Sequence, residues 1–322
     1  MRAAYATSLN PDDPLAGLVV GERPEPEPKP GWSTVQVKAV SLNHHDLWTL
    51  RGVGIKAELL PMILGCDAAG IDTATGNEVV VHGVISSPGW FGDETLDPGR
   101  SLLSERHQGS IAELVTVPTQ NLIPKPAELS FAEASCLPTA WLTAYRMLFV
   151  NSSLKPGQTV LVQGATGGVA SACIMLARAA GLRVWATART EEKQAKALEL
   201  GAHQAFENGA RLPERVDAVM ETVGAATWSH SLKSLRPGGQ VVISGATSGA
   251  TPPAELNRIF FLQLQVIGST MGTAAELRDL ISLLVSTGLR PNIDRTLPLE
   301  QVADGLRAME SGSLVGKIVV EP

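Results

Sequence analysis

The chain has 322 residues, of which 44% are hydrophobic, and it carries a formal net charge of −6. This length and hydrophobic content support a large core and two domains, and the acidic balance argues against a nucleic-acid partner. No apolar run approaches the roughly 18 residues of a membrane span, and the opening residues MRAAYATSLN lack the apolar core of a signal peptide, so we expect a cytoplasmic protein with no membrane partner.

The first 120 or so residues are rich in turns and contain short β-branched segments. Candidate strands run over residues 35–40, 78–82 and 110–117. Short strands separated by turn residues are typical of antiparallel sheets and barrels. The three cysteines of the chain form no Cys-x-x-Cys pair, so neither a zinc finger nor a disulfide framework is expected.

The segment 159–189, TVLVQGATGGVASACIMLARAAGLRVWATAR, predicts a strand, a glycine turn, a helix and a second strand. Small residues at the spacing Gly164-x-x-Gly167-x-x-Ala170 leave room for a pyrophosphate and allow the helix to pack closely on the sheet. A helix that starts near Val169 would point its first N–H groups and its positive dipole end at this space. The pattern predicts a dinucleotide-binding site.

The end of the second strand bears on which dinucleotide binds. An acidic residue there would hydrogen-bond the adenosine ribose, but the chain has Thr187 and Arg189, with Lys193 one turn further on. Cations favour a ribose 2′-phosphate, so we expect NADPH, with NADH less favoured. The alternative is that these cations solvate a surface helix, with Glu191 and Glu192 as their partners.

Later segments repeat the alternation of strand and helix. Strands ending at residues 220–224, 243–246 and 267–270 terminate in small or hydroxylic residues, as at the ligand-binding edge of a parallel sheet. The segment 292–320 looks unlike another strand-helix unit and is expected to return to the first domain. We predict an α/β protein with domains 1–122, completed by 289–322, and 123–288.

Several segments together resemble the medium-chain dehydrogenase/reductase superfamily, in its zinc-independent, quinone-oxidoreductase-like branch. The resemblance implies a GroES-like β-barrel catalytic domain and a Rossmann domain with a doubly wound parallel sheet that binds the nucleotide. It also implies a homodimer or a tetramer, of which we expect the homodimer. The segments that carry it are SLNHHDLWTLRG, LPMILGCDAAG, GSIAELVTVP, LPTAWLTAYRML, the glycine turn, METVGAATW, LRPGGQVVISGAT, IGSTMG and GKIVV.

Zinc-dependent members of this family hold the metal with a Cys, a His and a second Cys, with a Glu nearby. By motif, these places fall on Asn43, Cys66, Thr139 and Asp67, of which only Cys66 is a good zinc ligand. Residues 86–110, where the family carries a structural zinc lobe, contain no cysteine. We therefore expect no metal site, although an improvised site formed by His44, His45, Asp46 and Cys66 stays open.

Without zinc, a substrate carbonyl lacks a Lewis acid. Hydride transfer to an enone, an enoyl thioester or a quinone needs only hydrogen-bond donors and a later proton. We expect Asn43 to offer an amide N–H and His45 to donate or relay a proton. Asp46 belongs to this catalytic group, more as a residue that orients the loop than as a base. A purely structural role for His44 and His45 is equally open.

The glycine turn and the resemblance together predict the residues that bind the cofactor. Thr143 resembles a helix residue of the family near the nicotinamide, and Lys317 resembles a terminal lysine near the cofactor. The full set is Thr143, Gly164, Thr166, Gly167, Gly168, Val169, Thr187, Arg189, Lys193, Val223, Gly224, Ser244, Gly245, Ala246, Thr270, Met271 and Lys317.

These observations favour an NADPH-dependent oxidoreductase that reduces a quinone or an activated double bond without zinc. A zinc- or NAD-linked alcohol dehydrogenase is the first alternative, and an NADPH-binding protein without catalytic activity is the second.

Overall fold

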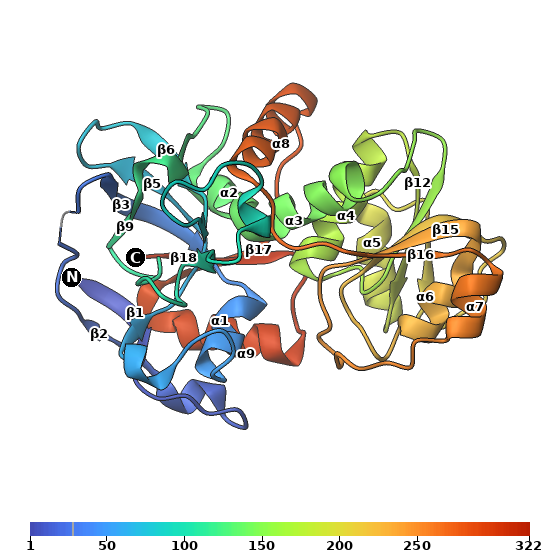
Figure 1. The fold of residues 1–322 in the computed structure, drawn as a ribbon, viewed down its shortest axis with the longest axis horizontal. Helices are drawn as coiled ribbons and strands as arrows, with labels where there is room; N and C mark the ends of the chain where they lie inside the picture. The colour runs from blue at the N-terminus through green and yellow to red at the C-terminus, as the bar shows by residue number, and fades with distance from the viewer. Residues whose placement is uncertain (28) are drawn as a thin grey trace. The chain divides into compact units, whose positions relative to one another are not determined.

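The computed structural model describes residues 1–27 and 29–322, which form two compact units (Figure 1). The first unit comprises Met1–Leu142 and Met271–Pro322, and the second comprises Thr143–Thr270. Residues 123–142 and 271–288 thus belong to the first compact unit, whereas the sequence analysis assigns them to the nucleotide-binding domain. The reason is packing, because helix α8 (Ala274–Thr287) contacts strand β10 (Leu122–Pro124) of the first unit.

The first unit is built on mainly antiparallel sheets, as the sequence predicts. The largest has seven strands in the order β10-β6-β5-β3-β18-β17, with β9 also paired to β3. A smaller sheet has the order β2-β1-β4, and β7 pairs with β8. The remaining strands span β1 (Arg2–Ala6), β2 (Leu18–Glu22), β3 (Trp32–Ser41), β4 (Met62–Ile63), β5 (Ala68–Asp72), β6 (Glu78–Val81), β7 (Val84–Ile85), β8 (Ser101–Leu102), β9 (Leu114–Pro118), β17 (Ile293–Pro298) and β18 (Lys317–Glu321).

Strand β3 shows why these segments form a sheet with a buried face. Val35 and Val37 are buried while Gln36 between them is exposed, which is the alternation of a strand with one face on the core. The three strands expected in this region are confirmed, but the last begins at Leu114, because residues 110 and 111 instead bond the backbone of residues 64 and 65.

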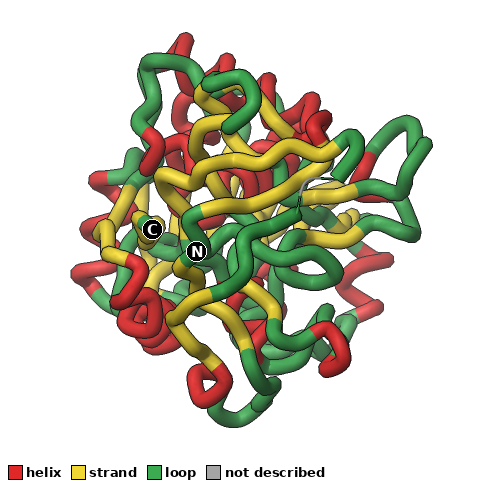
Figure 2. The backbone as a smooth tube through the Cα atoms, turned by 90° about the vertical axis from the view of Figure 1, so that its left-hand side faces the viewer, coloured by secondary structure: helices red, strands yellow, loops and turns green. Residues whose placement is uncertain are grey.

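The C-terminal segment returns to the first unit, as expected. Strand β18 pairs with β3, with Val319 opposite Ser41, so both ends of the chain lie in this unit (Figure 2). The helices that begin in this unit are α1 (His44–Leu50), α2 (Phe131–Ser135), α3 (Leu142–Tyr145), α8 and α9 (Val302–Ser311).

The second unit is a six-stranded parallel sheet in the order β13-β12-β11-β14-β15-β16, which confirms the predicted doubly wound sheet. Its strands are β11 (Thr159–Val162), β12 (Arg183–Ala188), β13 (Gln204–Glu207), β14 (Val216–Glu221), β15 (Leu235–Ile243) and β16 (Gln265–Gly268), and its helices are α4 (Gly168–Ala179), α5 (Glu191–Glu199), α6 (Trp228–Ser234) and α7 (Leu256–Phe261). The strand order reverses beside β11, and ligands of such sheets bind at this reversal.

Across residues 1–27 and 29–322, no helix combines the length and the apolar character that a bilayer crossing requires.

Candidate active site

The glycine turn follows strand β11 and leads into helix α4, as the sequence predicts. Gly164 has φ +68°, and a Cβ there would lie 2.9 Å from Cγ2 of Val223, so a side chain is excluded on both backbone and packing grounds. At Gly167, by contrast, an added Cβ would meet nothing nearer than 3.8 Å. The turn therefore keeps an open space at the start of the helix.

The start of α4 offers this space unpaired backbone donors. Gly167 is the N-cap residue and supplies no side-chain hydrogen bond, and the helix continues for 12 residues from Gly168. The first N–H groups of a helix lack intrahelical partners and carry the positive end of its dipole. The turn thus has the open space, donors and field that fit a dinucleotide pyrophosphate.

Two cations lie together where strand β12 gives way to helix α5. Arg189 is exposed, and within residues 1–27 and 29–322 it makes no hydrogen bond or ion pair. Partial burial lowers the pKa of Lys193, and the charge of Arg189 lowers it further, against an opposing effect of Glu192. Two neighbouring like charges are relieved by a bound anion, so this pair fits the 2′-phosphate of NADPH.

A buried glutamate at the end of β14 fixes the residues that follow this strand, and the sequence did not indicate this role. Glu221 is fully buried, and its Oε1 accepts the backbone N–H groups of Val223 at 2.8 Å and Gly224 at 3.1 Å. The hydroxyls of Thr227 and Ser231 also donate to this carboxylate. Val223 and Gly224 are thereby held in place, and Glu221 is a positioning residue.

Orphaned hydroxyls lie at the ends of the next two strands. Ser244 follows β15 and Ser269 follows β16, and neither buried Oγ has a hydrogen-bond partner among the described residues. At Gly245, an added Cβ would lie 2.9 Å from the carbonyl oxygen of Thr222. Unsatisfied buried hydroxyls beside a close backbone approach call for a polar ligand, and Ser269 was missing from the predicted set.

Thr187 is a correction to the predicted cofactor site. Its side chain is fully buried, and its hydroxyl donates to Oε1 of Gln163 at 2.6 Å. Successive side chains of a strand point to opposite faces, and the sequence did not reveal that Thr187 turns inward. The other predicted cofactor residues of the second unit lie in the glycine turn, at strand ends or at the unit's boundaries: Thr143, Thr166, Gly168, Val169, Ala246 and Thr270.

Within the first unit, Asn43 forms the centre of a closed hydrogen-bond network. Its Nδ2 donates to Oδ2 of Asp67 at 2.8 Å and to the carbonyl of Ser41 at 3.1 Å. Its Oδ1 accepts from Nζ of Lys317 at 2.5 Å, and the same ammonium donates to the carbonyl of Leu42. Both amide hydrogens are therefore committed, which corrects the expectation that Asn43 offers an N–H to a substrate.

The same network does not fit a zinc ion. Asn43 presents hydrogens where a ligand lone pair is needed, Thr139 donates its hydroxyl to Asp67 at 2.6 Å, and the Lys317 ammonium brings a positive charge. Burial raises the pKa of the Cys66 thiol, whereas zinc binds the thiolate. Among residues 1–27 and 29–322 there is no group of three or more His, Cys, Asp or Glu side chains placed to hold a metal.

His45 is paired with Glu105, a residue of the 86–110 loop that the sequence did not indicate. The His45 Nε2 and Glu105 Oε1 atoms lie 3.2 Å apart, and Nδ1 lies 3.4 Å from the Ser104 hydroxyl. Burial disfavours the charged imidazole, but the Cys66 sulfur, Glu105 and Asp46 outweigh it and raise the pKa of His45 well above its usual value. The hydrogen bond to His45 in turn helps to lower the pKa of Glu105, against the opposing effect of its burial, so the pair favours a charged imidazole beside a carboxylate.

Lys317 and Met271 were predicted to bind the cofactor and lie in the first unit. Lys317 is buried, and its ammonium donates two hydrogen bonds, to the carbonyl of Leu42 and to Oδ1 of Asn43. Met271 is also buried and adopts φ +49°, a conformation that costs a non-glycine residue about 1 kcal/mol or more.

Asp46 holds the loop rather than facing outward. It is fully buried, and it accepts the N–H of Asn43 at 2.8 Å through Oδ2 and the N–H of Gly65 at 3.1 Å through Oδ1. It forms a capping box with Asn43 at the start of α1. These contacts give Asp46 a positioning role.

Replacing Asp46 with alanine is expected to destabilise the first unit by about 1–3 kcal/mol, because two buried N–H groups lose their acceptor. Urea denaturation measures the difference in the free energy of unfolding between the variant and the unmodified chain. Burial, against the opposing charge of His45, raises the pKa of Asp46 from 3.8 to about 6, so the folded state binds this proton more tightly. The contribution of this proton to stability therefore falls as the pH rises from about 3.8 to about 6. Asp304→Ala, at an exposed position of α9, should change stability little. Equal losses of stability in the two variants would contradict the positioning role of Asp46.

The comparisons with known proteins agree with this architecture. The alcohol dehydrogenase GroES-like domain matches residues 29–127, and the zinc-binding dehydrogenase family matches residues 168–286. A crystal structure described as an NAD-dependent alcohol dehydrogenase superposes with a TM-score of 0.92 and 33% identity over 100% of both chains.

Two curated relatives are reductases or quinone-linked enzymes. Acryloyl-coenzyme A reductase of Sulfurisphaera tokodaii is 27% identical, over 96% of this chain and 98% of its own. Quinone oxidoreductase of Pongo abelii is 29% identical, over 92% of this chain and 90% of its own. The chain is an oxidoreductase that belongs to the medium-chain dehydrogenase/reductase superfamily, with a GroES-like domain and a Rossmann nucleotide-binding domain.

Proposed function

We propose that this protein is an NADPH-dependent reductase that transfers hydride to a quinone or to an activated double bond without zinc. The observation that carries the proposal is the Asn43 network. Asn43 and Thr139 both donate to Asp67, and Lys317 donates to Asn43. Three of the positions at which zinc-dependent members hold their metal, Asn43, Thr139 and Asp67, are therefore already hydrogen-bonded to one another. The names of the reductase and quinone-linked relatives support the same class of acceptor.

The cofactor proposal rests on the second unit. We propose that the Gly164–Gly168 turn and the start of α4 hold the pyrophosphate, that Arg189 and Lys193 hold the 2′-phosphate, and that Ser244 and Ser269 bind the polar groups at the nicotinamide end. When bound, the reduced nicotinamide supplies a hydride. The glycines exclude side chains from the turn, and the cations discriminate between the two nicotinamide cofactors.

His45 is the proposed proton donor in the first unit. Its raised pKa keeps the imidazole protonated near neutral pH. The 3.4 Å contact between Nδ1 and the Ser104 hydroxyl is long for a hydrogen bond, so Nδ1 is the atom we propose to release its proton to the substrate oxygen. Glu105 holds the other nitrogen and thereby orients the ring.

The acceptor panel is the direct experiment for this function. NADPH oxidation is followed with quinones, enones and enoyl thioesters, and NAD⁺ reduction is followed with primary and secondary alcohols. We expect turnover with at least one conjugated acceptor and none with the alcohols. Turnover confined to the alcohols would refute the proposal.

An NAD-linked alcohol dehydrogenase is the second candidate, because the 33% identical structure is described as an NAD-dependent alcohol dehydrogenase. The same panel separates the two candidates. The cytoplasmic location and the lack of nucleic-acid and membrane partners remain predictions from the sequence.

We also propose a homodimer, on the basis of an apolar surface on the second unit. Strand β16 ends the sheet order, so one side of it presents unpaired backbone groups. Beside it, Val266 on β16 and Leu256, Phe260 and Phe261 on α7 are exposed. An open edge flanked by exposed apolar side chains is typical of an interface with a second copy.

Val266→Lys is expected to convert the dimer to a monomer, because a lysine on an edge strand opposes pairing. Size-exclusion chromatography with light scattering measures the mass. Leu198→Lys, which changes an exposed leucine on α5 instead, should leave the dimer intact. A dimer that survives in both variants would place the interface elsewhere.

A further inference from the structure

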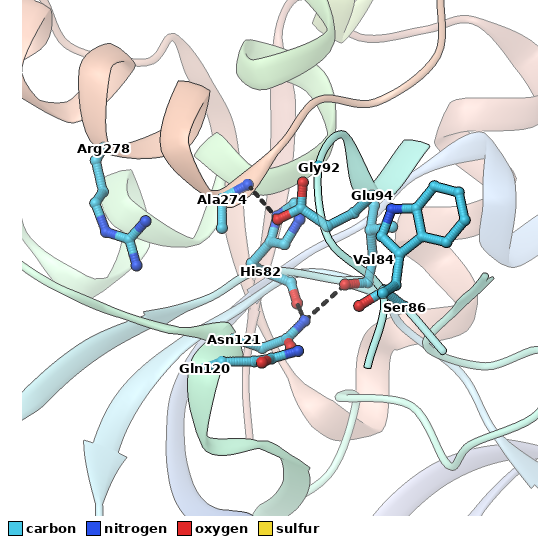
Figure 3. Close-up of a pocket in the computed structure, with 10 residues that line it drawn as sticks. His82, Val84, Ser86, Gly92, Glu94, Gln120, Asn121, Ala274 and Arg278 are labelled. Carbon is cyan, nitrogen blue, oxygen red and sulfur yellow. Dashed lines mark hydrogen bonds between the residues drawn. The ribbon is translucent and has the colours of Figure 1, made fainter. Parts of the chain in front are cut away.

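A polar cavity in the first unit is separate from the residues discussed above. It has a volume of about 220 Å³ and lies between the loop after β6 and the start of α8 (Figure 3). Its lining is His82, Val84, Ser86, Trp90, Gly92, Glu94, Gln120, Asn121, Ala274 and Arg278.

His82 is the unusual group in this cavity. Its side chain is buried, and neither ring nitrogen has a hydrogen-bond partner among the described residues. The backbone carbonyls of His82 and Val84 both accept a hydrogen bond from Asn121 Nδ2. A buried polar side chain without a hydrogen-bond partner lowers the stability of the folded state by about 1–3 kcal/mol. A bound ligand that pairs with the imidazole would remove this cost.

The protonation state of His82 defines what that partner offers. Burial, and secondarily the charge of Arg278, lowers the pKa of His82 to about 4. At neutral pH the ring is therefore uncharged, with one nitrogen as a donor and the other as an acceptor. A hydroxyl group is both donor and acceptor, whereas an ammonium only donates and a carboxylate only accepts.

The charges around the cavity balance. Arg278 and Glu94 both line it, and within the described residues they do not pair with each other. The Glu94 Oε1 accepts the N–H of Ala274 at 3.3 Å, at the positive end of α8, and Arg278 is exposed to water. Neither charge requires a counter-charge, and each repels a ligand of its own sign.

We propose that this cavity binds a small uncharged polyhydroxy compound, of the size of glycerol to a monosaccharide. Its hydroxyls pair with the His82 imidazole and with Glu94 and Ser86, and the Trp90 ring offers apolar surface to its C–H groups. A liquid water molecule occupies about 30 Å³, so 220 Å³ exceeds what a single bridging water fills. This site does not depend on the proposed function.

The test is ligand-observed saturation-transfer NMR on the full chain without cofactor, with glycerol, D-glucose and myo-inositol as probes. We expect saturable binding of at least one probe. His82→Leu should weaken it at least about tenfold, equivalent to about 1.4 kcal/mol, whereas His82→Gln, which keeps a donor and an acceptor, should retain most of it. Phe91→Ala, on the exposed part of the same loop, is the matched control and should bind as the unmodified chain does.

Three outcomes would overturn the proposal. They are no saturable binding of any of the three polyols, equal binding by the His82→Leu variant, and tighter binding of acetate or methylammonium than of the polyols. If His82→Leu fails to fold, Glu94→Ala, which removes another of the proposed hydroxyl partners, serves in its place, with the same expected loss. Because no nicotinamide is present, failure here leaves the reductase proposal unaffected.

Discussion

Arg189→Ala is expected to raise the dissociation constant for NADPH at least about tenfold, equivalent to about 1.4 kcal/mol, with little change for NADH. Arg189 has no ion-pair partner within residues 1–27 and 29–322. Burial lowers the pKa of Lys193, and the charge of Arg189 is the second cause of that shift. A 2′-phosphate neutralises both cations, and a bidentate guanidinium contact is the stronger part. Titration of the intrinsic fluorescence with each cofactor measures both constants.

Lys196→Ala is the matched control for this prediction. Lys196 lies on the same helix, one turn beyond Lys193, but it pairs with Glu199 at 2.7 Å. Its removal should leave both dissociation constants within about twofold, since an exposed pair of this kind contributes little. If Arg189→Ala weakened the binding of NADPH and NADH equally, Arg189 would not be a ligand of the 2′-phosphate.

His45→Gln is expected to lower turnover about 100-fold while leaving the dissociation constant for NADPH unchanged, because a positioned proton donor contributes about 10²–10⁴ to the rate. His45 is deprotonated as the pH rises through its raised pKa, so the rate should fall on the alkaline side, and this dependence should vanish in the variant. Steady-state rates across the pH range, at saturating NADPH, measure both effects.

Two neighbouring substitutions sharpen this test. Glu105→Gln removes the charge that favours protonated His45, so it should move the alkaline limb of the pH profile to lower pH. His44→Gln, at the adjacent exposed histidine, should leave the rate unchanged. If the His45→Gln variant kept the full rate, a group other than His45 would be the proton donor.

The parts of the fold that were predictable from sequence are those in which a residue type is forced by backbone geometry. The turn after β11 requires glycine at positive φ and at a close approach to Val223, and glycine is visible in the sequence. The alternation of Val35 and Val37 with polar residues in β3 is equally local. Such signals need no knowledge of distant contacts.

The errors arise where distant residues decide what a side chain does. Asn43 was expected to face a substrate, but Lys317, distant in sequence, takes its oxygen, and Asp67 takes one of its hydrogens. Thr187 was placed in the cofactor site, but Gln163 accepts its hydroxyl inside the sheet. Glu105 emerged as the partner of His45 only because a long loop folds back onto α1, and loops carry no periodic signal.

We propose that hydride transfer in this protein proceeds without zinc. The most direct measurement combines the metal content of the purified chain with the rate of NADPH oxidation by an active conjugated acceptor, before and after treatment with a strong chelator. The Asn43 network, with its committed amide and the neighbouring Lys317 ammonium, predicts far less than one zinc per chain and an unchanged rate. One zinc per chain, with activity that is lost on its removal and restored by adding it back, would contradict the account.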